Sequence, residues 1–342
     1  MYREYKKMKR IKFRTLITIL TIICLNICLC ACNSNNYLVP GVGADKYYRL
    51  DLKNLDNKDE VGNLRVITKD QFHFSKAKDK YNLDEDYIID ETGMDALNIS
   101  GSRQFSKKQF ESLSLILDRI ADEKQIYIID LRQENHAIIN GYPVSFYSEH
   151  NWENKNISND EIMSRQNKLF SNLLDKEMEI YLKGDDEKSS EELLKFKVSE
   201  CISEKELVES KGYKYINISC TDHVWPSAEN IDEFISFVKS IDMNNVWLHF
   251  HCVAGEGRTA TFMCLYDMMK NPQVSMKDIC YRQTKLGGNY PLYIQEKDDW
   301  KKQLYEEKAN MFPLLYQYIQ ENYQSNYEVT WSEWLNNNMP AS

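Results

Sequence analysis

Apolar and polar positions alternate in a way that predicts helices and strands in turn beyond residue 100. A helix is expected after Ser106, whose side chain and that of Gln109 match a capping box. Its apolar face is formed by Phe110, Leu113, Leu117 and Ile120. Short apolar runs typical of buried strands occur at residues 126–129, 215–218 and 246–250. Further helices are expected from Pro226-Ser227 and over about residues 259–269. This order predicts an α/β fold with a mostly parallel sheet.

The first 31 residues have a different pattern, with seven basic side chains and one acidic one, Glu4, before the apolar run 16–29. A basic stretch before a short apolar run is typical of a secretory signal peptide, and the run is short for a membrane-spanning helix. The sequence Leu29-Cys30-Ala31-Cys32 resembles the bacterial lipobox. The resemblance implies a lipoprotein signal peptide over residues 1–31, a lipid on Cys32 and a tether over 32–45. The protein would then be exported and held at the bacterial cell membrane by its N-terminal lipid. The alternative is an uncleaved N-terminal anchor.

Composition and charge exclude several classes of protein. Of the 342 residues, 42% are hydrophobic and 28% are charged, which excludes a disordered chain and a polytopic membrane protein. The net charge is −9, and because residues 1–31 carry +6, the remainder carries −15. Such an acidic chain is not expected to bind nucleic acid. Beyond residue 32 the cysteines form no CxxC pair, so neither a zinc site nor a disulfide framework is predicted: Cys201, Cys220, Cys252, Cys264 and Cys280.

The candidate chemistry lies in residues 251–259, His-Cys-Val-Ala-Gly-Glu-Gly-Arg-Thr, between a predicted strand and a predicted helix. Successive backbone amides at a helix N-terminus form a cradle for a phosphate dianion. Arg258 can grip two phosphate oxygens with its planar guanidinium. The cradle, expected to bind substrate, is formed by Val253, Ala254, Gly255, Glu256 and Gly257.

Cys252 is the expected nucleophile of this loop, because the positive field of the helix N-terminus and of Arg258 favours its thiolate. Thr259 is expected to donate its hydroxyl to the sulfur when the sulfur leaves. His251 is expected to orient the loop through its ring. A plain glycine-rich turn would not explain the cysteine, arginine and threonine together.

This loop resembles the phosphate-binding loop of the protein-tyrosine-phosphatase superfamily. In that superfamily an aspartate on a mobile loop protonates the leaving oxygen. Asp222 matches this general acid, because it lies in Thr221-Asp222-His223-Val224-Trp225-Pro226, 30 residues before Cys252.

A narrower resemblance is carried by four segments: residues 97–102, 130–136, 221–226 and 247–252. Together they are similar to the bacterial cysteine phytases, tyrosine-phosphatase-like enzymes that dephosphorylate myo-inositol polyphosphates. The resemblance runs from about Asn63 to Leu335. It implies a phosphatase core with a small β-barrel domain. We therefore expect the core over residues 46–141 and 214–342, with an inserted domain over 142–213.

The resemblance also implies roles for individual residues. Cys252, Arg258 and Asp222 match the catalytic set. Matches to substrate-binding residues are His223, Arg65, Lys301 and Lys308. Two positions depart from the family pattern. Val253 stands where relatives carry an acid, and Glu256 puts a carboxylate where they carry a small apolar residue.

The sequence thus predicts a cysteine-dependent phosphomonoesterase that acts on a small polyphosphorylated substrate through a cysteinyl-phosphate intermediate. It needs no metal, no cofactor and no obligate protein partner. One alternative is a protein tyrosine or dual-specificity phosphatase, which would not obviously need Arg65, Lys301 and Lys308. Another is a non-catalytic phospholigand-binding lipoprotein, against which the intact set of Cys252 and Asp222 argues. A sulfur or arsenate handler is a third.

Overall fold

The computed structural model describes residues 46–51, 59–68, 81–84, 86–183 and 192–339. The expected signal peptide, the tether and Cys32 lie outside these residues. Among the described residues, no helix is both long enough and apolar enough to span a membrane.

A five-stranded sheet forms the centre of the larger of the two structural units. Its hydrogen-bonded order is β10-β4-β11-β3-β2. The strands are β2 (Arg65–Val66), β3 (Ile99–Arg103), β4 (Gln125–Asp130), β10 (Lys214–Asn217) and β11 (Val246–Cys252). The first four in this order are mutually parallel, and β2 pairs antiparallel with β3. The predicted α/β fold with a mostly parallel sheet is confirmed.

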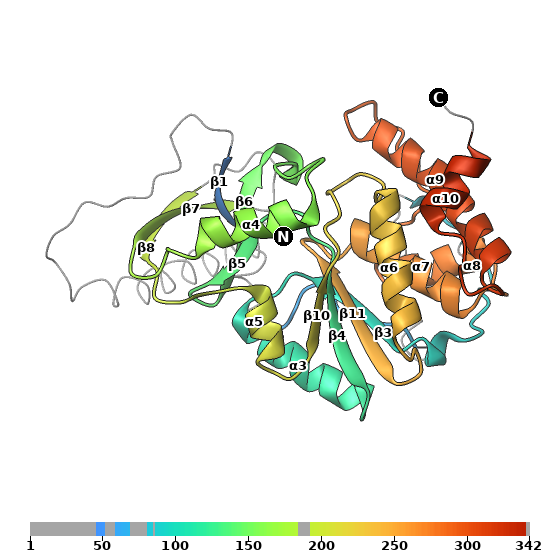
Figure 1. The fold of residues 1–342 in the computed structure, drawn as a ribbon, viewed down its shortest axis with the longest axis horizontal. Coiled ribbons are helices and arrows are strands. Elements are labelled where there is room, and N and C mark those ends of the chain that lie inside the picture. The colour runs from blue at the N-terminus through green and yellow to red at the C-terminus, as the bar shows by residue number, and fades with distance from the viewer. Residues whose placement is uncertain (1–45, 52–58, 69–80, 85, 184–191, 340–342) are drawn as a thin grey trace, which may run out of the picture.

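Helices cover both faces of this sheet (Figure 1). On one face lie α3 (Lys107–Ala121) and α5 (Glu204–Glu209), whose apolar side chains pack with Ile126, Ile128 and Trp247 of the sheet. The other face is covered by α6 (Ala228–Ser240), α7 (Gly257–Lys270), α8 (Met276–Lys285), α9 (Lys302–Asn322) and α10 (Trp331–Asn338). Because α7 runs through the middle of this layer, its side chains from Arg258 to Met269 are all buried.

The N-terminus of α3 has the geometry that its sequence predicts. The Ser106 hydroxyl accepts the Gln109 backbone N–H, and the Gln109 side chain accepts the Ser106 N–H in return. Phe105 and Phe110 stack across the cap with their ring centroids 4.9 Å apart. The predicted strands at 126–129 and 246–250 and the helix from Pro226-Ser227 are also present, as β4, β11 and α6.

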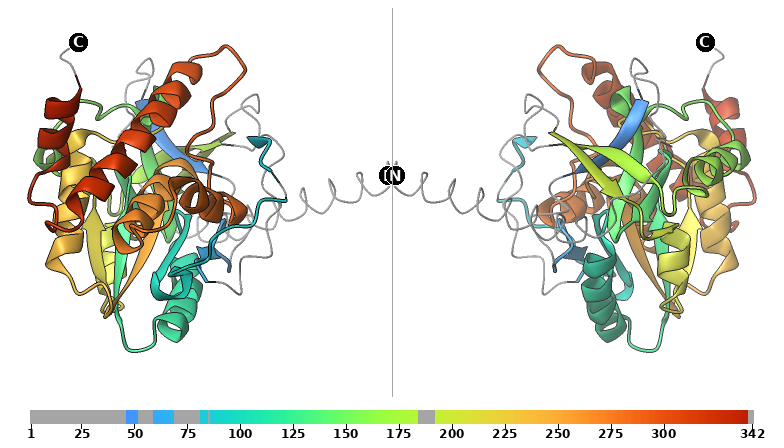
Figure 2. Two further views of the ribbon diagram at one scale, coloured as in Figure 1. Left: turned by 90° about the vertical axis from the view of Figure 1, so that its right-hand side faces the viewer. Right: turned by 90° about the vertical axis from the view of Figure 1, so that its left-hand side faces the viewer.

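A second, six-stranded sheet has the order β8-β7-β1-β6-β5-β9 and packs against α4 (Asn159–Phe170). Its strands are β1 (Lys46–Asp51), β5 (His136–Ile139), β6 (Tyr142–Ser148), β7 (Glu177–Lys183), β8 (Glu192–Lys197) and β9 (Cys201–Ile202). Strands β1 and β5 come from outside residues 142–213, so the sheet is wider than the insertion expected from the sequence. The hydrogen-bonded strand order begins at β8 and ends at β9, so a barrel-like closure is not confirmed for the described strands. Figure 1 shows the second sheet at one end of the molecule and the C-terminal helices at the other, and the two opposite views of Figure 2 look onto these ends in turn.

The capping box of α3 supports a quantitative prediction. Ser106→Ala removes the side-chain oxygen that accepts the Gln109 N–H, so the free energy of unfolding should fall by about 1 kcal/mol. Urea denaturation followed by circular dichroism measures this change. Ser112→Ala, within the same helix, is the matched control and should leave stability unchanged or slightly raised. Equal effects of the two substitutions would contradict a capping role.

Candidate active site

A pocket of about 420 Å³ opens at the C-terminal end of β11, where ligands commonly bind in parallel α/β sheets. Both sheets line it: Arg49 and Asp51 come from β1 of the second sheet, and the 252–258 loop comes from the core. Five cationic side chains face it: Arg49, Arg103, Arg258, Lys301 and Lys308. A polyanionic ligand therefore finds local positive charge on a chain whose net charge is negative.

Cys252 ends β11 at the base of this pocket, and the N-terminus of α7 begins at Gly257, five residues later. Between them Gly255 has a φ of 69°, and a Cβ placed on it would lie 2.3 Å from the Ser102 carbonyl carbon. Only glycine fits this position, and its tight path lets the loop curl over the strand end. The Thr259 hydroxyl donates to the Cys252 sulfur over 3.2 Å, as the sequence predicts.

Arg258 is held by a buried carboxylate that the sequence analysis did not assign. Its guanidinium donates to both oxygens of Glu134, over 2.8 and 3.1 Å, and to the backbone oxygen of Cys220 over 3.1 Å. Burial alone would raise the pKa of Glu134, but Arg258 and Arg132 hold it below its usual value. The ion pair fixes the plane of the guanidinium before any ligand arrives.

Asp222 is positioned from three directions. Its carboxylate lies 3.2 Å from the Arg258 guanidinium and accepts the Asn151 side-chain amide over 2.8 Å. Its backbone oxygen accepts the Trp152 indole N–H over 2.8 Å. Burial opposes ionisation, but Arg258, with His223 and Asn151, holds the pKa of Asp222 well below its usual range. Asn151 and Trp152 follow β6, so the second sheet fixes the candidate acid.

The substrate-binding residues expected on α9 and beside the acid do line the pocket. Lys308 is 8% exposed, and burial lowers its pKa. Lys301 immediately precedes α9 and lines the pocket with it. His223 adopts a φ of 68°, and burial lowers its pKa too. Glu256 also lines the pocket, so this departure from the pattern expected of relatives adds an acidic residue to its wall.

Two predicted site residues lie behind the loop instead. Arg65 does not line the pocket: it is 2% exposed and donates to the Gly255 carbonyl over 2.6 Å, so it supports the loop from beneath. Burial lowers its pKa to about 10. His251 points away from the ligand side, with its ring 5.0 Å from that of Phe105. Gly255 does not line the pocket either, and its carbonyl accepts a hydrogen bond from Arg65.

The sequence analysis missed several residues that the fold brings to the site: Arg49, Arg103, Glu134, Asn151 and Trp152. Glu134 carried a local signal, since it belongs to the polar run that directly follows the buried strand at 126–129. The other four approach Cys252 through contacts distant in sequence, for which no local pattern exists.

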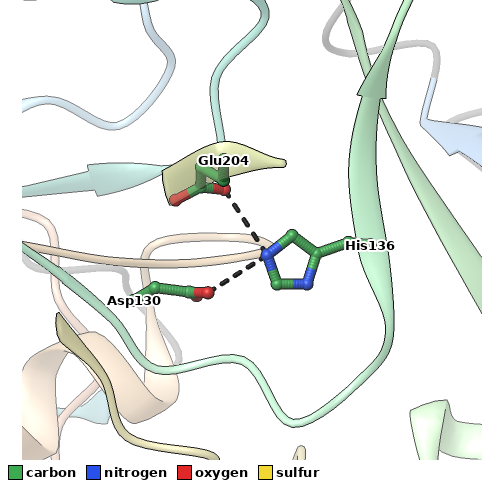
Figure 3. Close-up of side chains that lie close together, drawn as sticks. All are labelled: Asp130, His136 and Glu204. Atoms are coloured by element: carbon green, nitrogen blue, oxygen red, sulfur yellow. Dashed lines mark ion pairs between the residues drawn. The ribbon is translucent and has the colours of Figure 1, made fainter. Parts of the chain in front are cut away.

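Asp130, His136 and Glu204 are the one group among the described residues whose metal-binding atoms gather within 4.8 Å (Figure 3). All three are buried, and none of them lines the pocket. Their side chains contact one another directly, with His136 Nε2 3.1 Å from an Asp130 oxygen and 3.6 Å from a Glu204 oxygen.

Comparison with known proteins agrees with this geometry. The family model PTPlike_phytase, described as "Inositol hexakisphosphate", matches residues 129–270. The tandemly repeated protein tyrosine phosphatase-like phytase from Mitsuokella multacida is 36% identical, with a TM-score of 0.79 over 88% of this chain and 50% of that one. A PTP-like phytase from Bdellovibrio bacteriovorus is 26% identical, with a TM-score of 0.64 over 88% of this chain and 98% of that one.

Among curated proteins, the effector protein hopD2 of Pseudomonas syringae pv. tomato is 28% identical over 250 residues, 71% of this chain and 52% of hopD2. The chain thus spans about half the length of the Mitsuokella and Pseudomonas proteins. Its fold and its 252–258 loop agree with these matches: the chain is similar to the PTP-like phytases, and residues 129–270 match their family model.

Proposed function

We propose that this protein is a phosphatase of myo-inositol polyphosphates that works through a cysteinyl-phosphate intermediate. The observation that carries the proposal is the single pocket in which Cys252, Arg258 and Asp222 meet the cationic side chains Lys301 and Lys308. A nucleophile, a phosphate clamp and a proton donor together suit phosphate-ester hydrolysis. The added cations suit a substrate with several phosphates.

The Mitsuokella relative supports the substrate class. It has been solved as a PTP-like myo-inositol phosphatase in complex with myo-inositol-(1,3,4,5)-tetrakisphosphate, and this chain is 36% identical to it with a TM-score of 0.78. A ring bearing several phosphates places one at the nucleophile and others within reach of neighbouring cations. Arg49, Arg103, Lys301 and Lys308 are available here for those outer phosphates.

In the first step, the Cys252 thiolate attacks phosphorus in line with the leaving oxygen. The S–P bond forms, the P–O bond to the inositol ring breaks, and Asp222 transfers its proton to the leaving alkoxide. Arg258 and the loop amides stabilise the charge on the equatorial oxygens. In the second step, water attacks phosphorus, Asp222 takes the water proton, and the S–P bond breaks. Thr259 donates its hydroxyl to the departing sulfur.

Asp222 can carry a proton in the first step because substrate changes its surroundings. Without substrate, its carboxylate lies 3.2 Å from the Arg258 guanidinium, which favours the ionised form. A bound phosphate dianion occupies the same guanidinium and adds negative charge beside the carboxylate. Both changes favour the protonated acid. Substrate binding thus prepares its own proton donor.

We also propose that the protein is exported and anchored to the bacterial membrane by a lipid on Cys32. The proposal is supported by the basic stretch, the short apolar run and the sequence Leu29-Cys30-Ala31-Cys32. Such a protein meets its substrate outside the cytoplasm, and the active site requires no disulfide there.

The substrate assignment predicts release of inorganic phosphate from myo-inositol hexakisphosphate by the full chain, with EDTA present. Cys252→Ser should reduce the rate at least about 10³-fold, because the alcohol is a far weaker nucleophile than a thiolate. Cys201→Ser, at a half-buried thiol away from the pocket, is the matched control and should keep full activity. Release only from a phosphotyrosine peptide would overturn the inositol substrate. Release from neither would favour a phospholigand-binding protein.

The role of Asp222 predicts a leaving-group effect. Asp222→Asn should lower kcat for inositol hexakisphosphate about 100-fold or more, and much less for para-nitrophenyl phosphate, whose leaving group needs no proton. The wild-type kcat should fall as the pH rises through the pKa of Asp222 in the complex, and this decline should vanish in the variant. Asp298→Asn, at an exposed carboxylate, is the control. Equal losses on both substrates would exclude proton donation.

The lipid proposal predicts that cells expressing the full chain incorporate labelled palmitate into it. Cys32→Ser should abolish the label and release the protein from the membrane fraction, because the thiol is the acceptor. Cys28→Ser lies in the same segment and should keep the label. Unlabelled wild-type protein in the membrane fraction would favour the uncleaved N-terminal anchor instead.

A further inference from the structure

Two carboxylates and two imidazoles are buried together directly behind the nucleophile. Asp130 ends β4, His136 begins β5, Glu204 begins α5, and His251 precedes Cys252 in β11. The four side chains are at most 4% exposed. The group therefore joins the two sheets and one helix to the strand that carries the nucleophile. No step of the proposed reaction uses it.

The contacts within this group are short. His251 Nε2 lies 2.7 Å from one Glu204 oxygen and 3.9 Å from an Asp130 oxygen. His136 Nε2 lies 3.1 Å from Asp130 and 3.6 Å from the other Glu204 oxygen. Figure 3 shows the Nε2 edge of His136 turned toward both carboxylates. Each carboxylate thus faces both imidazoles.

Both ring nitrogens of His136 face oxygen atoms. His136 Nδ1 is 2.7 Å from the Glu134 backbone oxygen, which can only accept, so Nδ1 carries a proton. A lone pair on Nε2 would then face two carboxylates at close range. Nε2 lies 3.1 Å from Asp130 and 3.6 Å from Glu204, so a positive charge on the ring would be stabilised by both carboxylates.

Glu204 depends on the imidazoles more than Asp130 does. Asp130 also accepts from the Tyr215 hydroxyl, the Asn217 amide and the Arg132 backbone N–H. Neither Glu204 oxygen has a hydrogen-bond partner among the described residues, so its contacts with His251 and His136 are those of ion pairs. A buried carboxylate without a counter-charge is strongly destabilising, so His136 and His251 provide its compensation.

The other charged or titratable groups around His251 are Arg132, Asp130 and, two residues away on the same strand, His249. Burial and Arg132 disfavour the imidazolium, but Glu204 and then Asp130 raise the pKa of His251 above its usual value. His249 has hydroxyl neighbours, Ser100 and Ser102, and burial lowers its pKa well below the usual value. Of the two histidines on β11, His251 is thus the one whose surroundings favour the charged ring.

We propose that Glu204 is a positioning residue for the nucleophile and acts through the imidazolium of His251. His251 and Cys252 are neighbours on β11, so fixing the ring on one face of the strand fixes the Cys252 sulfur on the other. The 2.7 Å contact between His251 and Glu204 leaves no room for a metal ion between them. The catalytic effect rests on the proposed function, whereas the charge state of His251 does not.

Glu204→Gln, which keeps the shape and removes the charge, tests the proposal in the full chain. With inositol hexakisphosphate, kcat should fall about tenfold while KM changes less than about twofold, because the cations that bind substrate are untouched. A separate alkaline decline of kcat, distinct from the one set by Asp222 and retained in Asp222→Asn, should begin at lower pH in Glu204→Gln, because His251 loses the carboxylate that holds its proton. Glu209→Gln, on the exposed end of the same helix, is the matched control and should behave like the wild type. Unchanged kcat and an unchanged pH profile in a folded Glu204→Gln variant would overturn the proposal.

A second measurement does not depend on activity. Nitrogen-15 NMR of labelled histidine side chains reports ring protonation, and His251 should stay charged to higher pH in the wild type than in Glu204→Gln. If Glu204→Gln does not fold, Glu204→Asp keeps the charge, and it should retain the charged ring with a lower kcat. A neutral His251 in the wild type near pH 6 would overturn the proposal even if the enzyme is active. One equivalent of divalent metal per chain, lost in Glu204→Gln, would overturn it in favour of a metal site.

Discussion

The buried pair of Arg258 and Glu134 is the interaction on which the site depends. A guanidinium 5% exposed needs a counter-charge, and Glu134 supplies one through two hydrogen bonds. The same two bonds fix the guanidinium plane, so that one edge is left toward Asp222 and the pocket. Because Glu134 lies four residues beyond the end of β4 and Arg258 is the second residue of α7, the pair also ties the strand ends to the helix that carries the loop amides.

This arrangement explains why the loop needs support from beneath as well as from the side. Backbone amides turned toward a phosphate leave their carbonyls turned the other way, into the protein. Arg65 and Asn63 donate to the carbonyls of Gly255 and Ala254 from below. A loop held in this way keeps its donors aimed at the anion without reorganisation, which is the condition for strong stabilisation of transition-state charge.

Local sequence patterns predicted the parts of the molecule that are set by neighbours in the chain. The Ser106 cap, the strand before Cys252 and the helix after Gly257 follow from capping chemistry and hydrophobic periodicity. Arg65 was expected to contact substrate and lies beneath the loop instead, because a resemblance carries a residue type and not the direction in which its side chain points. His251 alternates with Cys252 on one strand, so the two cannot face the same side.

The remaining site residues follow from tertiary structure, which the sequence does not display. Arg49 reaches the pocket only because β1 pairs with β6 and β7 in a sheet assembled from distant segments.

The second sheet has a physical reason to lie against the core. Asn151 and Trp152 bind the side chain and the backbone of Asp222, so the candidate acid is held by residues of another unit. Asn151 has a φ of 62°, in the left-handed region. This conformation costs energy for any residue other than glycine and persists where surrounding contacts impose it. The β1 residue Arg49 donates to the Asn151 side chain over 3.3 Å and lines the same pocket. The pocket residue Arg49 therefore contacts Asn151, the residue that holds the Asp222 carboxylate. Arg49 and Asp222 are thus linked through the Asn151 side chain, which accepts from one and donates to the other.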